Sequence, residues 1–226
     1  MKPMADIQTD FDRLAQFSGE DHVWDHNNHY HGYLLKHVPQ RCDEALEIGC
    51  GTGMFSRALA KKAKHVTAID LSPEMIRRAK ERSTGARNID FEVKDVLHWD
   101  LPDAHFDCIA SIATLHHLAM EDILSKIKRA LKPNGVLLVV DLLQETGGIG
   151  MYARGAIAIA MSAALKLIKN GRAQNSAEEQ AAWEAHGKDD HYLTIPELQR
   201  ICDDVLPGAQ LKQHLLWRYS LVWKKP

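Results

Sequence analysis

Short apolar runs alternate along the chain with segments whose apolar residues recur at helical spacing. Apolar runs at residues 45–48, 66–69, 89–93, 106–111 and 136–140 predict five strands, and the last of these is wholly apolar. Continuous apolar strands joined by helices are typical of a parallel sheet that helices cover on both faces. The pattern therefore predicts an α/β fold with a ligand crevice at the carboxyl ends of the strands.

The two ends of the chain add elements to this core. Ile7, Phe11 and Leu14 recur at helical spacing and predict an N-terminal amphipathic helix. The capping-box pattern at residues 194–197 opens a late helix, and apolar runs at 211–216 and 219–223 predict a closing hairpin. We expect one domain, 1–226, made of an N-terminal helical cap (1–40), a core (42–142), a helical insertion or lid (143–193), and a closing helix with a hairpin (194–226).

The strand and helix alternation does not account for the apolar stretch at residues 149–168. This stretch is nearly long enough to cross a bilayer, but it carries Arg154 and Lys166 within a globular chain, so stable membrane insertion is not expected. Three interpretations stay open: a buried helix hairpin that completes the core, a lid over an acceptor pocket, or a helix on a membrane surface. A lid or a surface helix would favour an apolar substrate.

Composition narrows the classes of partner and compartment. The 226 residues carry 28 Lys and Arg against 30 Asp and Glu, a net charge of −2, which does not favour a nucleic-acid partner. The four cysteines form no CxxC pair, which is typical of a reducing compartment. Acidic residues precede any long apolar stretch at the N-terminus, so no secretory signal is expected. These features predict a cytoplasmic protein.

A glycine turn, EIGCGTG at residues 47–53, follows the first strand. Its three glycines leave backbone without a Cβ to obstruct a ligand. Met54 stands where the dinucleotide pattern has its third glycine, and Glu47 lies two residues ahead of the first glycine. A pyrophosphate needs backbone N–H groups at a helix start, whereas a nucleoside cofactor without phosphates needs space and a few acceptors. The turn therefore favours a nucleoside cofactor, near which carboxylates are tolerable.

Acidic residues end three successive predicted strands. Asp70, after the second strand, is placed to accept both hydroxyls of an adenosine ribose. Asp95, after the third, is placed to accept from an adenine amino group, with Val96 and Met75 as apolar neighbours of the ring. A single acid at a strand end is more often a solvated loop residue or a helix cap. Together with Glu47 and the glycine turn, however, these acids predict a nucleoside-binding crevice.

Five segments of the chain resemble the successive motifs of class I S-adenosylmethionine-dependent methyltransferases. They are ALEIGCGTGMFSRALA, VTAIDLSPEMIRRAKER, VKDVLHWDLP, FDCIASIATLHHL and LKPNGVLLVVDL. The resemblance covers residues 42–142, and the closing HLLWRYSLVWKKP is similar to the terminal antiparallel hairpin of that fold. The resemblance implies a doubly wound, seven-stranded, mostly parallel sheet and S-adenosylmethionine as the cofactor. Within the family, the chain is most similar to the small-molecule branch that includes ubiquinone and menaquinone methylation enzymes. In that family the glycine turn holds the methionine part of the cofactor, while the acids at the positions of Asp70 and Asp95 bind the ribose and the adenine. The expected cofactor-binding residues are Glu47, Gly49, Cys50, Gly51, Gly53, Asp70, Leu71, Met75, Asp95, Val96, Ser111 and Ile112, with Tyr30 and Trp24 from the cap.

Methyl transfer from a sulfonium is an in-line displacement, so positioning and desolvation do most of the work. An oxygen, nitrogen or carbon acceptor usually must lose a proton as well, and a histidine within hydrogen-bond reach would serve as the base. His116, after the fourth strand, and His31, in the cap, are the two candidates. A pair such as His116 and His117 also occurs in packing or loop-fixing roles, and that reading stays open.

The cap segment contains a histidine pattern that resembles a metal site. His22, His26 and His29 fall on one helical face, and Asp25 would supply a carboxylate. Surface or capping histidines are the commoner outcome of such a pattern, and no further ligand cluster can be located from the sequence. We therefore predict no metal.

We expect methyl transfer to a small organic acceptor by a monomer or homodimer. A nicotinamide-dependent oxidoreductase is disfavoured by Met54 and by the lack of a Y-x-x-x-K pair. Methylation of macromolecules is disfavoured by the charge and by the absence of an N/D-P-P-Y type of motif after the fourth strand. A protein that binds S-adenosylmethionine or S-adenosylhomocysteine without catalysis remains the alternative, and acceptor-dependent product formation separates it from an enzyme.

Overall fold

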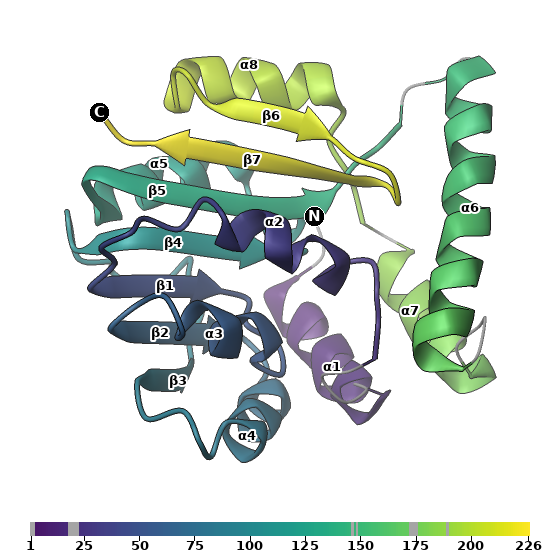
Figure 1. Cartoon of the computed structure of the whole chain (residues 1–226), viewed down its shortest axis with the longest axis horizontal. Coiled ribbons are helices and arrows are strands. Elements are labelled where there is room, and N and C mark those ends of the chain that lie inside the picture. Colours follow the sequence, from purple (N-terminus) through teal and green to yellow (C-terminus); the bar gives the residue numbers. More distant parts are fainter. Residues whose placement is uncertain (1–2, 18–22, 146, 148, 172–175, 189) are drawn as a thin grey trace.

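The computed structural model describes residues 3–17, 23–145, 147, 149–171, 176–188 and 190–226 (Figure 1). Its centre is a seven-stranded sheet in the order β3-β2-β1-β4-β5-β7-β6. Neighbouring strands from β3 to β5 are parallel, whereas β7 is antiparallel to both β5 and β6. The predicted fold class and the closing hairpin are confirmed. The strands are β1 (Glu44–Ile48), β2 (His65–Asp70), β3 (Ile89–Val93), β4 (Phe106–Ile112), β5 (Leu131–Leu142), β6 (Gln210–Gln213) and β7 (Arg218–Lys224).

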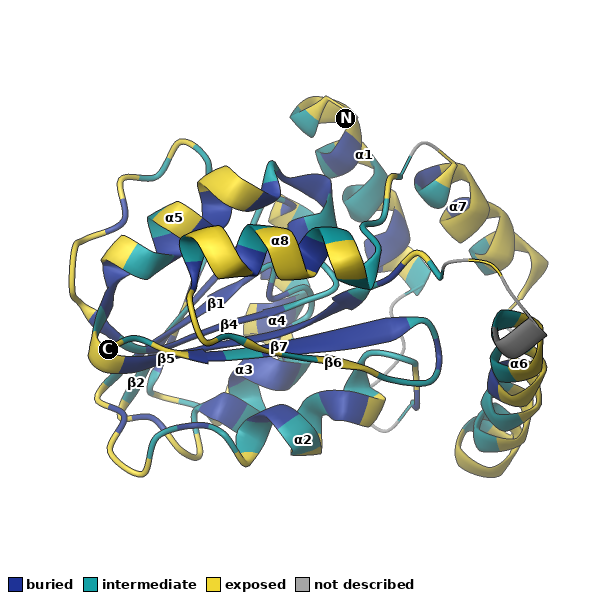
Figure 2. Cartoon of the chain, turned by 90° about the horizontal axis from the view of Figure 1, so that it is seen from above, coloured by how far each residue is buried: buried dark blue, intermediate teal, exposed yellow. Residues whose placement is uncertain are grey.

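Helices cover the sheet on both faces (Figure 2). Helices α5 and α8 pack on one apolar cluster, while α2, α3 and α4 pack on the other. Successive residues of β5 alternate between the clusters, because side chains along a strand point to opposite faces: Leu137 belongs to the first cluster and Leu138 to the second. The helices are α1 (Met4–Leu14), α2 (His31–Leu35), α3 (Met54–Leu59), α4 (Pro73–Arg82), α5 (Met120–Ala130), α6 (Ile149–Asn170), α7 (Ala177–Gly187) and α8 (Ile195–Val205), with 3₁₀ turns at Ala15–Phe17, Asn28–Tyr30 and Leu115–His117.

Side-chain caps fix where two of these helices begin. The Ser72 hydroxyl accepts a hydrogen bond from the backbone N–H of Met75, ahead of a proline in the first turn of α4. At α8, Thr194 and Glu197 form the predicted capping box. These contacts use only neighbouring residues, which is why the sequence alone locates both starts.

Two boundaries differ from the sequence prediction. Apolar residues at helical spacing predict a helix over residues 54–63, but α3 ends at Leu59. The sequence Pro133-Asn134-Gly135 predicts a turn, but these residues lie inside β5. They form an irregularity there, because Phe106 pairs with Leu131 and the register resumes where Cys108 pairs with Val136. The chain thus passes from α5 into β5 without leaving the sheet.

Helix α1 lies within the segment 1–40 for which an N-terminal cap is expected. It packs against both α4 and α7, and Leu14 shares an apolar cluster with Met75 and Ala182. The Asp12 carboxylate accepts hydrogen bonds from the Ser72 hydroxyl and, at 3.3 Å, from the Glu74 backbone N–H. The cap is therefore attached directly to the start of α4, next to the glycine turn.

The stretch between β5 and α8 corrects one interpretation. Residues 149–170 form the single long helix α6, which stands beyond the carboxyl ends of the parallel strands (Figures 1 and 2). Only 6% of the segment Met151–Asn170 is buried, although its length and composition would suffice to cross a membrane. The buried helix hairpin is therefore wrong. The helix contacts the domain through a small cluster around Ala158, Trp24 and Leu216, which does not cover its outer side.

Candidate active site

The glycine turn between β1 and α3 adopts backbone that only glycine enters without strain. Gly49, Gly51 and Gly53 have φ values of 75°, 52° and 78°. A Cβ on Gly49 would collide with Thr114, whereas a Cβ on Gly51 would meet no atom within 4 Å. The backbone N–H groups of Gly49 and Cys50 both donate to the Ile69 carbonyl at 2.9 Å. The turn is therefore anchored to β2 and leaves open space in front of Gly51.

Two buried carboxylates lie beside this turn. Asp70 accepts hydrogen bonds from the backbone N–H groups of Gly51, at 2.8 Å, and Ser72, at 2.9 Å. Glu47 is 2% exposed and accepts a hydrogen bond from the Ser56 hydroxyl. Burial, together with the negative charge of Asp70, raises the pKa of Glu47 to about 8, and burial also raises the pKa of Asp70. A cationic ligand here would relieve the repulsion between the two acids.

The remaining predicted cofactor residues line the same strand ends. Asp95 follows β3 and accepts from the Leu97 backbone N–H at 2.8 Å and from His98 Nδ1 at 2.6 Å. Ser111 is fully buried and donates its hydroxyl to the Ile48 carbonyl, so it joins β4 to β1. Val96, Met75 and Cys50 are buried, while Leu71 and Ile112 are half-buried.

The cap residues are placed differently from one another. The Tyr30 hydroxyl donates to the Leu215 carbonyl at 2.5 Å. Trp24 is buried in the cluster that holds α6. His31, at the start of α2, packs its ring edge-on against Phe55, with centroids 5.0 Å apart. His31 does not line the cavity described next.

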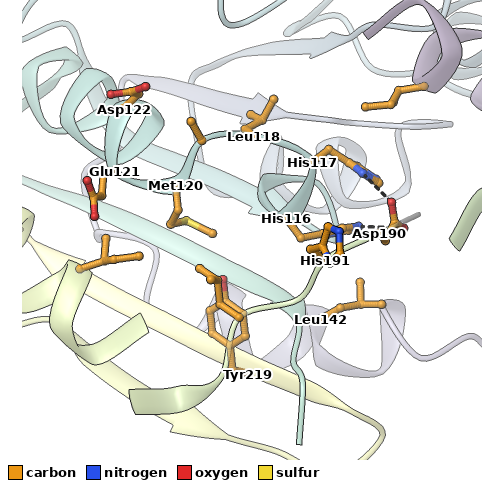
Figure 3. A pocket seen from close by; sticks show the side chains of 14 residues that line it. His116, His117, Leu118, Met120, Glu121, Asp122, Leu142, Asp190, His191 and Tyr219 are labelled. Carbon is orange, nitrogen blue, oxygen red and sulfur yellow. Dashed lines mark ion pairs between the residues drawn. The ribbon is translucent and has the colours of Figure 1, made fainter. Parts of the chain in front are cut away.

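A cavity of about 380 Å³ lies where β4 and β5 end, and it contains His116 (Figure 3). His116 Nδ1 lies 2.6 Å from an Asp141 carboxylate oxygen, and the His116 backbone N–H donates to the other oxygen at 3.1 Å. Burial opposes ionisation of Asp141, but the charge of His116 and these hydrogen bonds lower the pKa of Asp141 below its usual value. The carboxylate thus holds the imidazole with Nε2 directed away from Asp141. The cavity lining is Ile7, His116, His117, Leu118, Ala119, Met120, Glu121, Asp122, Leu142, Asp190, His191, Leu193, Ile201 and Tyr219.

Asp190, from the segment after α7, joins several histidines of this region. Its carboxylate lies 3.9 Å from His116 Nε2, 3.4 Å from His117 Nδ1 and 4.0 Å from His186 Nε2. Burial opposes its ionisation, but the hydrogen bond from His117 and the surrounding imidazoles lower the pKa of Asp190 to about 2. His186 also contacts Asp10 of α1 at 3.2 Å. The network therefore fastens the cap to the loop after β4.

His116, His117 and Asp190 are also relevant to the sequence prediction that the protein binds no metal. Ligand atoms of His116, His117 and Asp190 lie within 4.8 Å of one another, a spacing that a metal ion would accept. The histidine pattern in the cap does not converge in this way: His26 Nε2 contacts the Ser162 hydroxyl, and His29 Nδ1 accepts from the Trp24 indole. His22 lies outside the described residues. The same three residues also form ion pairs, since Asp190 lies 3.9 Å from His116 Nε2 and 3.4 Å from His117 Nδ1.

Comparisons with known proteins place this site in a family. A family model described as a methyltransferase domain matches residues 46–139. An uncharacterized methyltransferase from Mycobacterium bovis is 30% identical over 208 residues, which cover 91% of this chain and 99% of that protein. The chain belongs to the class I S-adenosylmethionine-dependent methyltransferase family. A ubiquinone biosynthesis O-methyltransferase from Xylella fastidiosa is similar to this methyltransferase, with 32% identity over 162 residues, 68% of this chain and 63% of that protein.

Solved structures share the fold of this methyltransferase. The N-methyltransferase NodS from Bradyrhizobium japonicum, in complex with S-adenosyl-L-homocysteine, has a TM-score of 0.63 and 20% identity, covering 96% of this chain and 98% of that chain. A methyltransferase from Aquifex aeolicus has a TM-score of 0.60 and 18% identity, covering 96% and 98%. The cofactor of the family is S-adenosylmethionine. The open space at Gly51 and the two buried carboxylates fit such a cationic nucleoside.

Sequence reasoning missed two residues of this methyltransferase site. Asp141 is the single charged residue in the run VLLVVDLL, and that interruption of an apolar strand was a usable signal. Asp190 carries no comparable signal, because it follows α7 and reaches the histidines only through the tertiary fold.

Proposed function

We propose that this methyltransferase transfers a methyl group to a small organic acceptor held in the cavity beside His116. The observation that carries the proposal is the 2.6 Å contact between His116 and the buried Asp141 at the wall of that cavity. A carboxylate that fixes one ring nitrogen leaves the other free to take a proton. S-adenosylmethionine supplies an electrophilic methyl group when bound, and the protein must then orient the acceptor and receive its proton.

His116 is the general base in this proposal. Its Nδ1–H donates to Asp141, which fixes the ring orientation and stabilises the imidazolium after the proton arrives at Nε2. Asp190, whose carboxylate lies 3.9 Å from Nε2, is a second polar group on this side of the cavity. His31 is the weaker candidate, since it packs on Phe55 and does not line the cavity.

The cofactor occupies the crevice formed by the strand ends of the other half of the sheet. The glycine turn, with Gly49, Gly51 and Gly53, admits the methionine part, while Asp70 accepts the ribose hydroxyls. Asp95 and Val96 border the adenine. The expected set also includes Glu47, Cys50, Leu71, Met75, Ser111, Ile112, Tyr30 and Trp24.

The acceptor class follows from the cavity wall. Leu118, Met120 and Leu142 are among the apolar side chains that line it, with His116 and Asp190 as polar groups on one side. Such a wall favours an apolar compound with one polar group to be methylated. The similar protein from Xylella fastidiosa, a ubiquinone biosynthesis O-methyltransferase, supports an acceptor of this class.

The proposal extends to the setting in which the reaction takes place. The described structure holds Cys42, Cys50, Cys108 and Cys202 as buried free thiols, which suits a reducing cytoplasm. We infer a monomer or homodimer that acts without nucleic acid and without an insertion across the membrane. Sedimentation analysis of the purified chain tests the oligomeric state.

The test is acceptor-dependent formation of S-adenosylhomocysteine from S-adenosylmethionine, screened over small apolar phenols, amines and carboxylic acids. Turnover with one acceptor class is expected, and His116→Ala should reduce turnover by about a hundredfold or more. His31→Ala is the matched control, with turnover within about threefold of the unsubstituted protein. Equal losses in both variants would contradict the assignment of the base to His116, and cofactor binding without turnover on any acceptor would favour a non-catalytic binding protein.

A further inference from the structure

Helix α6 presents an outward face made of apolar residues. Tyr152, Ile159 and Ile168 are 72%, 63% and 75% exposed, and Ile157 and Leu167 are 56% and 57% exposed. The exposed positions between residues 152 and 168 follow helical spacing and contain only alanine and these five larger residues. Soluble surfaces rarely present a continuous apolar face of this kind without a partner.

The inward side of α6 carries polar contacts beside the small apolar cluster around Ala158. Arg154 donates to the His214 carbonyl at 3.0 Å, and the Ser162 hydroxyl contacts His26 Nε2 at 2.7 Å. The Asn170 side chain exchanges two hydrogen bonds with the backbone of Trp24, at 2.7 and 2.8 Å. Five of the larger apolar residues of α6 therefore face outward, on the side that an amphipathic surface helix usually fills with polar residues. The same contacts hold α6 along the domain, so it cannot span a bilayer without exposing Arg154 to lipid.

The charges of α6 select the kind of surface that covers it. The helix contains three basic residues, Arg154, Lys166 and Lys169, and no acidic residue. Arg154 faces the domain, where it lies 3.5 Å from Glu145, so Lys166 and Lys169 are the basic residues that bear on the outer surface. Two copies of the helix packed face to face would bring these lysines together, whereas an anionic lipid surface would attract them. The aromatic ring of Tyr152 also suits the headgroup region.

We propose that α6 docks this methyltransferase on an anionic lipid bilayer, with the apolar face of the helix in the interfacial region. The helix stands beyond the carboxyl ends of β4 and β5, the same end of the sheet that carries the cavity with His116 (Figure 1). A bilayer at this position would supply an apolar acceptor to that cavity. This substrate route rests on the proposed function, whereas the docking itself does not.

The docking test measures binding of the full chain to vesicles of phosphatidylglycerol and phosphatidylcholine by flotation, without cofactor or acceptor. The test variant is Ile157→Glu with Leu167→Glu, because both side chains are exposed and neither belongs to the cluster that fastens α6. The control is Gln199→Glu with Gln210→Glu, which adds the same charge at exposed positions of α8 and β6. Unchanged thermal melts verify that both variants fold.

The unsubstituted chain and the control should float with the vesicles, and the α6 variant should bind at least tenfold more weakly. Phosphatidylcholine alone should bind more weakly than the anionic mixture. Failure of the unsubstituted chain to bind, or equal binding by the α6 variant, would overturn the proposal. So would a dimer in solution that the α6 variant dissociates, because a second copy would then cover the helix.

A turnover assay distinguishes the membrane docking of α6 from the proposed methyl transfer. With an acceptor dissolved in detergent micelles, the α6 variant should retain turnover, since Ile157 and Leu167 do not line the cavity. Loss of vesicle binding with retained turnover supports docking and leaves the proposed function intact. Vesicle binding with no turnover on any acceptor would count against the proposed function alone.

Discussion

The crevice at the strand ends has a cofactor half, with the glycine turn and Asp70, and an acceptor half, with the cavity beside His116. Different kinds of contact hold the two halves together. On the cofactor side, the polar groups of the glycine turn and of the strand ends are held by neighbours close in the sequence or on the adjacent strand, as in the contact of Asp70 with the Gly51 backbone N–H. On the acceptor side, His116 also meets an adjacent strand through Asp141 of β5, but further contacts join distant segments, as in the pair His186 with Asp10. The cofactor half thus follows mainly from the strand and turn pattern, whereas the Asp190 network of the acceptor half forms only after the cap and α7 have packed.

The largest expected effect concerns the acceptor half. Asp141→Asn should lower turnover by about a hundredfold, because the amide cannot hold the His116 imidazolium as a carboxylate does. S-adenosylhomocysteine affinity should stay within about twofold if the halves are separable. Steady-state kinetics and calorimetric titration measure the two quantities. A parallel loss of cofactor affinity would show that the halves are one cooperative unit.

Glu47→Gln tests how much the ionised, buried Glu47 side chain destabilises the cofactor half. The folded protein raises the pKa of Glu47 from 4.5 to about 8, so the free energy of unfolding of the unsubstituted protein falls as pH rises from 4.5 to 8. The variant lacks this ionisation. In the absence of cofactor it should gain about 2 kcal/mol or more over the unsubstituted protein at pH 9, and nothing at pH 4. Urea unfolding at the two pH values measures the difference, and a pH-independent difference would contradict the assignment.

Gly51→Ala tests the open space in front of the turn. Both Gly51 and Gly208 have positive φ, and a Cβ on either would meet no neighbour within 4 Å. Each alanine variant should therefore lose about 1 kcal/mol of stability from backbone strain. Only Gly51→Ala should also weaken S-adenosylmethionine binding, by about tenfold. Equal S-adenosylmethionine affinity in the two variants would show that the ligand does not bind next to Gly51.

His26→Gln tests the attachment of α6 to the cap. Burial, with the nearby charges of Arg218 and Lys166, lowers the pKa of His26 from 6.5 to about 4. The unfolded chain therefore binds a proton that the folded chain does not, and stability falls as pH drops from 7 to 5. Over this range the free energy of unfolding of the variant should fall by about 1 kcal/mol less than that of the unsubstituted protein, as measured by urea unfolding. An unchanged pH dependence would exclude His26 as its source.

The smallest expected effect is that of a chelator. Ion pairs account for the group formed by His116, His117 and Asp190, so dialysis against EDTA should leave turnover within about twofold. Metal analysis of the same sample accompanies the assay. A loss of turnover that a divalent cation restores would make these residues ligands, and the acceptor half would then depend on a metal.

The contrast between the halves also explains what the sequence predicts. The strands, the cap at Ser72 and the acids near the ends of β1 and β2 follow from short patterns, because their contacts lie within a few residues or between adjacent strands. The outward apolar face of α6 could not be predicted, since hydropathy counts the apolar residues but does not tell which side meets the domain. Asp190 likewise enters the site through packing between α7 and α1, which no local pattern encodes.

Calorimetric titration of Asp70→Ala and His116→Ala with S-adenosylhomocysteine, beside turnover assays, tests the division into halves most directly. Asp70→Ala should lose at least about tenfold in affinity, because charge-assisted hydrogen bonds to the ribose contribute roughly 1.5 to 3 kcal/mol. His116→Ala should keep its affinity and lose turnover. Unchanged affinity in Asp70→Ala, or a large loss of affinity in His116→Ala, would contradict the account.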